Sequence, residues 1–298
     1  MSLPCAAVDL SFGLGEMLSH AFMRHAFIAG TAIAIPAGLV SYFTVLRRQV
    51  FAGDALGHAA FTGALAALAF ALDARVGLFA AIVAAALMMG AFGPKARADD
   101  VVIGSLFAWI LSLGVLFLSI FTASKSTGNS VAGVRTLFGS IFGLDQEHTV
   151  VAVTVGVMVT AVLLLIARPL LFASLDEAVA ETRRVPVRLL GYLFLVLVGI
   201  SAGEATQAIG AVLILGLIAT PGGIAQRLTT QPFQGMYLSC LVAVGSMWSG
   251  LTLSYAIPRC PPSFAIIAVA AGVYLAVLLF TGAVRRVSVS GEEAGESV

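Results

Sequence analysis

Apolar stretches long enough to cross a lipid bilayer recur along the whole chain and are separated by short polar or charged segments. A helix needs about 20 mostly apolar residues to span the hydrocarbon core. The pattern therefore predicts an all-α, polytopic membrane protein with one transmembrane domain over residues 1–298. We count about nine spans, with eight as the alternative: 27–46, 54–72, 76–93, 101–121, 150–167, 189–203, 207–225, 235–256 and 264–283.

Composition agrees with this pattern. The chain is 60% hydrophobic and 10% charged, whereas a soluble domain is about 25% charged. The net charge of +1 gives no reason to expect a nucleic-acid partner. The three cysteines form no CxxC pair, and the sequence leaves open whether Cys5 and Cys260 pair with each other. The sequence has no GxxxxGK[ST], HExxH or GxSxG motif, so we expect no enzyme activity and no ATP hydrolysis by this chain.

The loops on the two sides of the predicted spans differ in positive charge. One side holds eleven of the 16 Lys and Arg residues and the other holds five. Because positive loops stay in the cytoplasm, the N-terminus is predicted outside and the C-terminus inside. The small and acidic residues of the tail predict disorder over 285–298.

Asp54 and His58 stand out because the predicted spans are otherwise almost free of ionisable groups. Residues four apart lie on the same face of a helix, so this pair can offer an oxygen and a nitrogen to one divalent metal ion. An ionisable group in a membrane segment is by default a candidate functional site. The alternative is that Asp54 caps a helix and His58 is an internal, hydrogen-bonded residue.

Two long connections carry further candidates. In the inner one, residues 172–188, Ser174 and Glu177 fit a capping box, and acids precede arginines, which predicts a short helix able to dock a soluble partner. Its candidate contact residues are Ser174, Asp176, Glu177, Glu181, Arg183 and Arg184.

The outer connection, residues 122–149, contains an apolar run that predicts a short helix at the membrane surface. Its Leu137, Phe138 and Phe142 serve either as packing or as a gate. The acids of the outer loops, including Asp145, Glu147 and Glu204, are expected to be solvated, with Glu204 in the turn after the sixth span. The alternative is that Glu204, or the cluster of Asp145, Glu147 and His148, attracts cations at the entry to the transport path.

Four blocks of sequence extend these observations. They are FTVLRR at 43–48 with GDALGHA at 53–59, DVVIG at 100–104, LFGSIFG at 137–143, and VPVR at 185–188 followed by AIGAVL at 208–213, Pro221 and RLT at 227–229. In order and spacing they resemble the permease subunits of ATP-binding-cassette importers for zinc and manganese. Gly57 stands where that family usually has serine, and Ser263 where it tends to have glycine.

The resemblance implies a vitamin-B12-importer-like permease fold in a bacterial inner membrane. It implies a homodimer, a cytoplasmic ATP-binding-cassette ATPase dimer and an extracytoplasmic metal-binding protein as partners. It also makes 172–188 the coupling helix on the ATPase and Asp54 and His58 contacts for the transported Zn²⁺ or Mn²⁺. No permanently bound cofactor is implied.

Other functions stay open at this point. A permease of the same architecture for a siderophore, haem or cobalamin chelate would need no Asp54–His58 pair. A proton-coupled secondary transporter would work without an ATPase, although we find no clear internal repeat. A membrane enzyme using the pair as acid and base lacks a nucleophile. The pair alone does not separate zinc from manganese, because imidazole suits zinc and carboxylate suits manganese.

Overall fold

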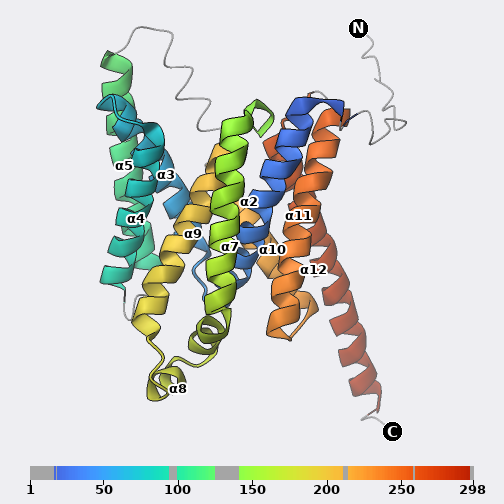
Figure 1. The fold of residues 1–298 in the computed structure, drawn as a ribbon. Coiled ribbons are helices and arrows are strands. Elements are labelled where there is room, and N and C mark those ends of the chain that lie inside the picture. The colour runs from blue at the N-terminus through green and yellow to red at the C-terminus, as the bar shows by residue number, and fades with distance from the viewer. Residues whose placement is uncertain are drawn as a thin grey trace.

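The computed structural model describes residues 17, 19–93, 99–124, 141–210, 214–257 and 259–295, with side chains up to Thr281 apart from residues 208 and 209. Over these residues the chain is helical and contains no strand, as predicted. Nine long helices form one bundle and run up and down in turn (Figure 1): α2 (Ala21–Leu46), α3 (Val50–Ala69), α4 (Ala74–Phe92), α5 (Asp100–Ser124), α7 (Gln146–Leu175), α9 (Val187–Ile209), α10 (Ile214–Leu228), α11 (Pro232–Ala256) and α12 (Pro262–Gly295).

Each predicted span corresponds to one of these nine helices. Seven of them are long and apolar enough to cross a membrane, judged over the described part of the chain. The other two are α3, which carries Asp54 and His58, and α10, which has 15 residues. Both pack inside the bundle, where α3 contacts α4, α5 and α9, and α10 contacts α2 and α12.

The boundary between the sixth and seventh spans differs from the prediction. The apolar run ends near 203, but α9 continues to Ile209. Its next residues, Glu204 to Gln207, include alanine, glutamate and glutamine, which are good helix formers and extend the helix without being apolar. The helix stops at Gly210, whose φ of 92° is a conformation that glycine adopts without strain.

The last helix, α12, extends to Gly295. The disorder expected over residues 285–298 stays a prediction. No proline interrupts α12 after its first residue, Pro262, and the helix therefore propagates beyond the apolar span.

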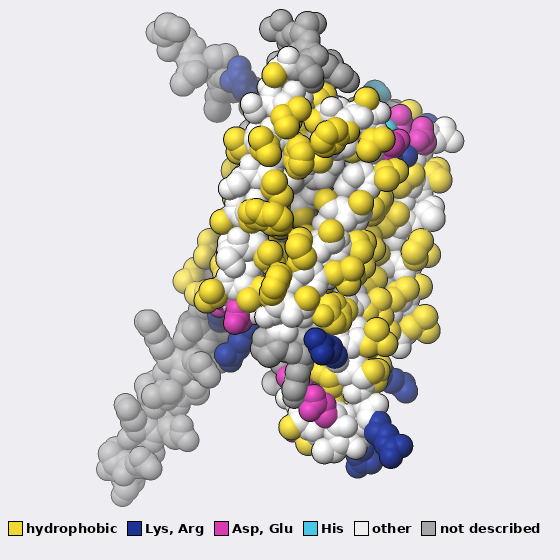
Figure 2. Space-filling view, turned by 90° about the vertical axis from the view of Figure 1, so that its left-hand side faces the viewer, with side chains coloured by type: hydrophobic (Ala, Val, Ile, Leu, Met, Phe, Trp, Pro, Cys, Tyr) yellow, Lys and Arg dark blue, Asp and Glu magenta, His cyan; other side chains and the backbone are white. Residues whose placement is uncertain are grey.

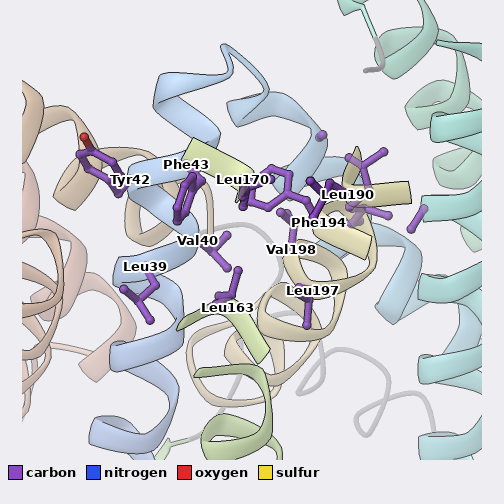
Figure 3. Packing of buried hydrophobic residues seen from close by; sticks show 14 of the residues in the cluster. Leu39, Val40, Tyr42, Phe43, Leu163, Leu170, Leu190, Phe194, Leu197 and Val198 are labelled. Atoms are coloured by element: carbon purple, nitrogen blue, oxygen red, sulfur yellow. The ribbon is translucent and has the colours of Figure 1, made fainter. Parts of the chain in front are cut away.

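The centre of the bundle is packed by α2, α7 and α9. Figure 3 shows side chains of the three helices converging there. Phe43 of α2 and Phe194 of α9 are fully buried, with their ring centroids 6.1 Å apart and nearly edge to face. Leu163 and Leu170 of α7 complete the contact and are also fully buried. This core fixes α9 relative to the N-terminal helices.

Large apolar side chains also cover much of the exterior, above all on α4 and α5. Val101 is 79% exposed, Val115 68% and Trp109 54%. Figure 2 shows hydrophobic side chains over the middle of this face and charged ones toward its two ends. A surface of this kind fits lipid or another apolar partner and does not fit water.

Candidate metal site and its surroundings

Asp54 and His58 lie on the first half of α3, one turn apart, and both side chains are half-buried. The His58 ring lies against the Phe107 ring of α5, with 5.2 Å between the ring centroids. One turn further on, Thr62 Oγ1 donates a hydrogen bond of 3.1 Å to the carbonyl of Ile110, which ties α3 to α5. The pair therefore lies on the side of α3 that faces α5.

Glycines let the neighbouring face of α3 approach α9 and α10. A Cβ added at Gly53 would lie 2.9 Å from Ile218 Cγ2, and one at Gly57 would lie 3.1 Å from Ile214 Cγ2. The same added Cβ at Gly57 would lie 3.3 Å from the hydroxyl oxygen of Thr206 on α9. Tight packing against α10 thus accounts for glycine at 57, and Thr206 places a hydroxyl near this position from the opposite helix.

The chemistry of the pair is that of an incomplete metal site. One carboxylate and one imidazole supply two ligands, and the described His, Cys, Asp and Glu side chains include no group of three that could hold an ion. The remaining ligands of any ion held here would have to come from outside the pair.

The inner connection forms a short helix, but its capping differs from the prediction. α7 continues through Ser174, whose hydroxyl donates to the carbonyl of Leu170 at 2.6 Å, so Ser174 is not an N-cap. Asp176 caps α8 (Glu177–Thr182) by accepting from the N–H of Val179 at 3.0 Å. A cap must leave helical geometry, and the chain does so only at Asp176, where φ is −143°.

A buried arginine lies beside this helix pair. Arg47, at the end of α2, is 3% exposed, and its Nη1 donates to Ser174 Oγ at 3.4 Å. Its Nε donates to Gln49 Oε1 at 3.1 Å, and its guanidinium lies 5.2 Å from the centre of the Phe194 ring. Arg47 thus links the α2–α3 turn, which precedes Asp54, to the end of α7 that leads into α8.

Of the candidate gate residues, Leu137 and Phe138 lie outside the described residues. Phe142 lies in the 3-10 turn η2 (Ile141–Gly143) and packs edge to face on Phe22, with ring centroids 5.8 Å apart. Cys5 also lies outside the described residues, whereas Cys260 is a free, half-buried thiol. The possible Cys5–Cys260 pairing and the gate remain predictions.

The start of α7 gathers charged groups from two helices. Arg75 of α4 bonds to Glu147 with 3.0 Å between Nη1 and Oε1. Asp145 caps α7 by accepting from the backbone N–H of His148 at 2.9 Å, and its carboxylate contacts the ring Nδ1 at 2.6 Å. These two hydrogen bonds hold the pKa of Asp145 below its usual range. Asp145 and Glu147, both predicted to be solvated, are therefore ordered although they are exposed.

The sequence of this chain matches a known protein family over most of its length. The sequence profile of the ABC 3 transport family matches residues 19–281, which is most of the chain. The chain belongs to the ABC 3 transport family. This family's permeases are membrane subunits, in agreement with the helical bundle and its apolar exterior.

Two named relatives match this chain over most of the length of both proteins. The manganese transport system membrane protein MntC of Halalkalibacterium halodurans is 28% identical over 247 residues, which is 83% of each chain. The manganese import system permease protein ScaB of Streptococcus parasanguinis is 28% identical over 244 residues, covering 80% of this chain and 85% of that protein.

Solved structures share the fold. PsaBC from Streptococcus pneumoniae in complex with Fab aligns with a TM-score of 0.76 at 24% identity, covering 89% of this chain and 95% of that one. An inward-facing metal-chelate type ABC transporter aligns with a TM-score of 0.66 at 16% identity, covering 89% of both chains. The permease fold expected from the sequence is therefore confirmed.

The sequence does not predict the burial of one acid, Glu204. Glu204 was expected in a solvated turn, but it lies inside α9 and is 6% exposed. A signal was present in the sequence, because Ser201, Glu204 and Gln207 recur every three residues, which places them on one face if the helix continues. The end of the apolar run was mistaken for the end of the helix.

Proposed function

We propose that this chain is the membrane-spanning permease subunit of an ATP-driven importer for a divalent transition metal ion. The observation that carries the proposal is the Asp54–His58 pair, which presents two metal-ligating groups on one face of a helix in a family of transport permeases. Relatives named for manganese transport favour Mn²⁺ over Zn²⁺ as the cargo.

The proposed assembly contains two copies of this chain, a cytoplasmic ATP-binding-cassette ATPase dimer and an extracytoplasmic metal-binding protein, in a bacterial plasma membrane. The absence of a nucleotide-binding GxxxxGK[ST] motif in the sequence supports a separate ATPase. The excess of Lys and Arg at the α8 end supports a cytoplasmic position for α8, with the start of α2 outside.

In this proposal α8 transmits ATPase movement to the metal site. Its capping carboxylate, Asp176, and the exposed Glu181, Arg183 and Arg184 form the docking surface. Arg47 then connects the α7–α8 corner to the turn before α3. A displacement of α8 would thereby reach the helix that carries Asp54 and His58, and the path would open inward as the ion leaves these ligands.

The test measures metal accumulation in bacterial cells that lack their own manganese and zinc importers and express this chain with its partners. We expect Asp54→Asn or His58→Ala to reduce uptake to background at unchanged expression, because each removes one of two ligands. Asp100→Asn, an exposed acid in the first turn of α5, and His20→Ala, an exposed histidine before α2, serve as matched controls.

The same cells separate the rival functions. Undiminished ion uptake in both variants would refute the ligand assignment. Uptake of a siderophore, haem or cobalamin chelate that needs neither Asp54 nor His58 would identify a chelate permease instead. Uptake that persists without the ATPase would identify a secondary transporter.

A further inference from the structure

A stripe of polar side chains runs along the face of α9 that meets α2 and α7. Ser201, Glu204 and Gln207 follow one another at three-residue spacing, which places them on one side of the helix. Ser201 is 3% exposed and Glu204 is 6% exposed. The Oγ of Ser201 and the Oε1 of Glu204 have no hydrogen-bond partner among the described residues. A buried carboxylate of this kind needs a proton or a cation to offset its desolvation.

The carboxylate borders two narrow cavities that follow each other along the α7–α9 seam; the outer has room for about one water-sized particle and the inner for none. The outer cavity is lined by Glu204 together with His148 and Gln207. The inner one is lined by Glu204 together with Ser201 and Pro36. Since Pro36 has no N–H, the carbonyl of Ala32, which also lines the inner cavity, lacks its usual helical donor. Glu204 is therefore bordered by the polar side chains of His148 and Gln207 in the outer cavity and by Ser201 and Ala32 in the inner one.

His148 is held in a form suited to metal binding. Its Nδ1 contacts Asp145 Oδ1 at 2.6 Å, which leaves Nε2 as the nitrogen available to a ligand. A carboxylate behind a histidine is the usual arrangement that orients the ring and strengthens it as a metal ligand. The positive charge of Arg75, which is near this end of the bundle, is offset by its bond to Glu147.

We propose that Glu204, His148 and Gln207 form a second binding site for a divalent transition metal ion at the outer end of the bundle. A carboxylate oxygen, an imidazole nitrogen and an amide oxygen are ligands that Mn²⁺ and Zn²⁺ accept. The site shares no residue with Asp54 and His58, which lie on the opposite, α5-facing side of α3. It receives the ion first, and Ser201 offers the next oxygen inward.

The inference rests on the proposed function for the identity of its cation, but its test is separate. Mn²⁺ binding to the purified full chain is measured by the loss of the free Mn²⁺ signal in electron paramagnetic resonance. We expect two bound ions per chain. Glu204→Gln should weaken one of them about tenfold or more, because even partners behind a ligand contribute about tenfold. Asp54→Asn should weaken the other and leave the Glu204 site intact.

Two further variants keep the test decisive. Asp73→Asn neutralises an exposed carboxylate at the same end of the bundle, can still cap α4, and should leave both sites unchanged. His148→Ala alters a side chain that is 43% exposed, so it should weaken the outer site even if Glu204→Gln fails to fold. Binding by Glu204→Gln and His148→Ala that equals the parent chain would show that Glu204 holds only a proton, and would overturn the inference.

The outcomes separate the two proposals. Loss of one ion in Asp54→Asn alone supports the proposed function and rejects the outer site. Loss of one ion in Glu204→Gln alone supports the outer site and rejects Asp54 as a ligand.

Discussion

Ala71, just after α3, has a backbone φ of 56°, in the left-handed region that favours glycine. The N–H of Leu72 bonds to the carbonyl of Ala67 at 2.8 Å, and the N–H of Ala71 to that of Leu68 at 3.3 Å, which together form a Schellman motif. Because the left-handed conformation costs an L-residue about 1–2 kcal/mol and glycine's extra entropy offsets part of this, Ala71→Gly should stabilise the chain by about 0.5–1 kcal/mol.

The matched control for Ala71 lies one turn earlier on the same helix. Ala66→Gly should destabilise the chain by about 1 kcal/mol, because position 66 is in the helix interior. Thermal unfolding of the purified chain in one detergent measures both variants. If both shift the midpoint in the same direction, the assigned C-terminal cap of α3 is wrong.

Single residues also show what the sequence could and could not reveal about the site. Asp54 and His58 were found because they interrupt a span, and an ionisable group there is conspicuous. Glu204 was missed because it follows an apolar run, where a buried acid and a solvated loop acid look alike. Burial is decided by residues 32–36 of α2 and 148–159 of α7, which lie at least 45 residues away in sequence, so no local pattern reports it.

At the level of helix pairs, glycine sets the closest approach between α3 and α4. A Cβ added at Gly63 would lie 2.3 Å from the carbonyl oxygen of Gly77 and 2.3 Å from Ala81 Cβ. Small residues bring membrane helices into contact in this way. Gly63→Ala should therefore push α4 away and destabilise the chain by about 1–3 kcal/mol.

Gly104 on α5 provides the comparison for Gly63. A Cβ added there meets nothing within 4 Å, so Gly104→Ala should be neutral or stabilise α5 by up to about 1 kcal/mol. Denaturation in a graded detergent series measures both changes. Equal stability of the two variants would contradict the close α3–α4 contact.

The positions of the helices were predictable because each is set by its own sequence. Hydropathy alone located all nine, including α3 and α10, which are the least apolar. Their ends were less predictable, because polar helix-forming residues extend a helix beyond its apolar stretch. α9 runs to Ile209 for this reason. α7 also runs past its predicted end, to Leu175, and this moves the cap of α8 from Ser174 to Asp176.

At the scale of the whole molecule, the charge pattern predicts which side of the membrane each end of the bundle faces. α7 begins beside Asp145 and Glu147 and ends at the corner that leads into α8 (Figure 1). Its 30 residues correspond to about 45 Å of helix, which is more than the hydrocarbon core of about 30 Å. Its two ends must therefore emerge on opposite sides of the membrane.

Two engineered cysteines at these ends test the orientation in a chain whose three native cysteines are replaced. Glu147→Cys changes a side chain that is 75% exposed, and Glu181→Cys changes an exposed residue of α8. A membrane-impermeant maleimide added to intact spheroplasts should label Glu147→Cys only, and permeabilisation should add labelling of Glu181→Cys. The reverse pattern would place α8 outside, where no ATPase could reach it, and would remove the basis for its coupling role.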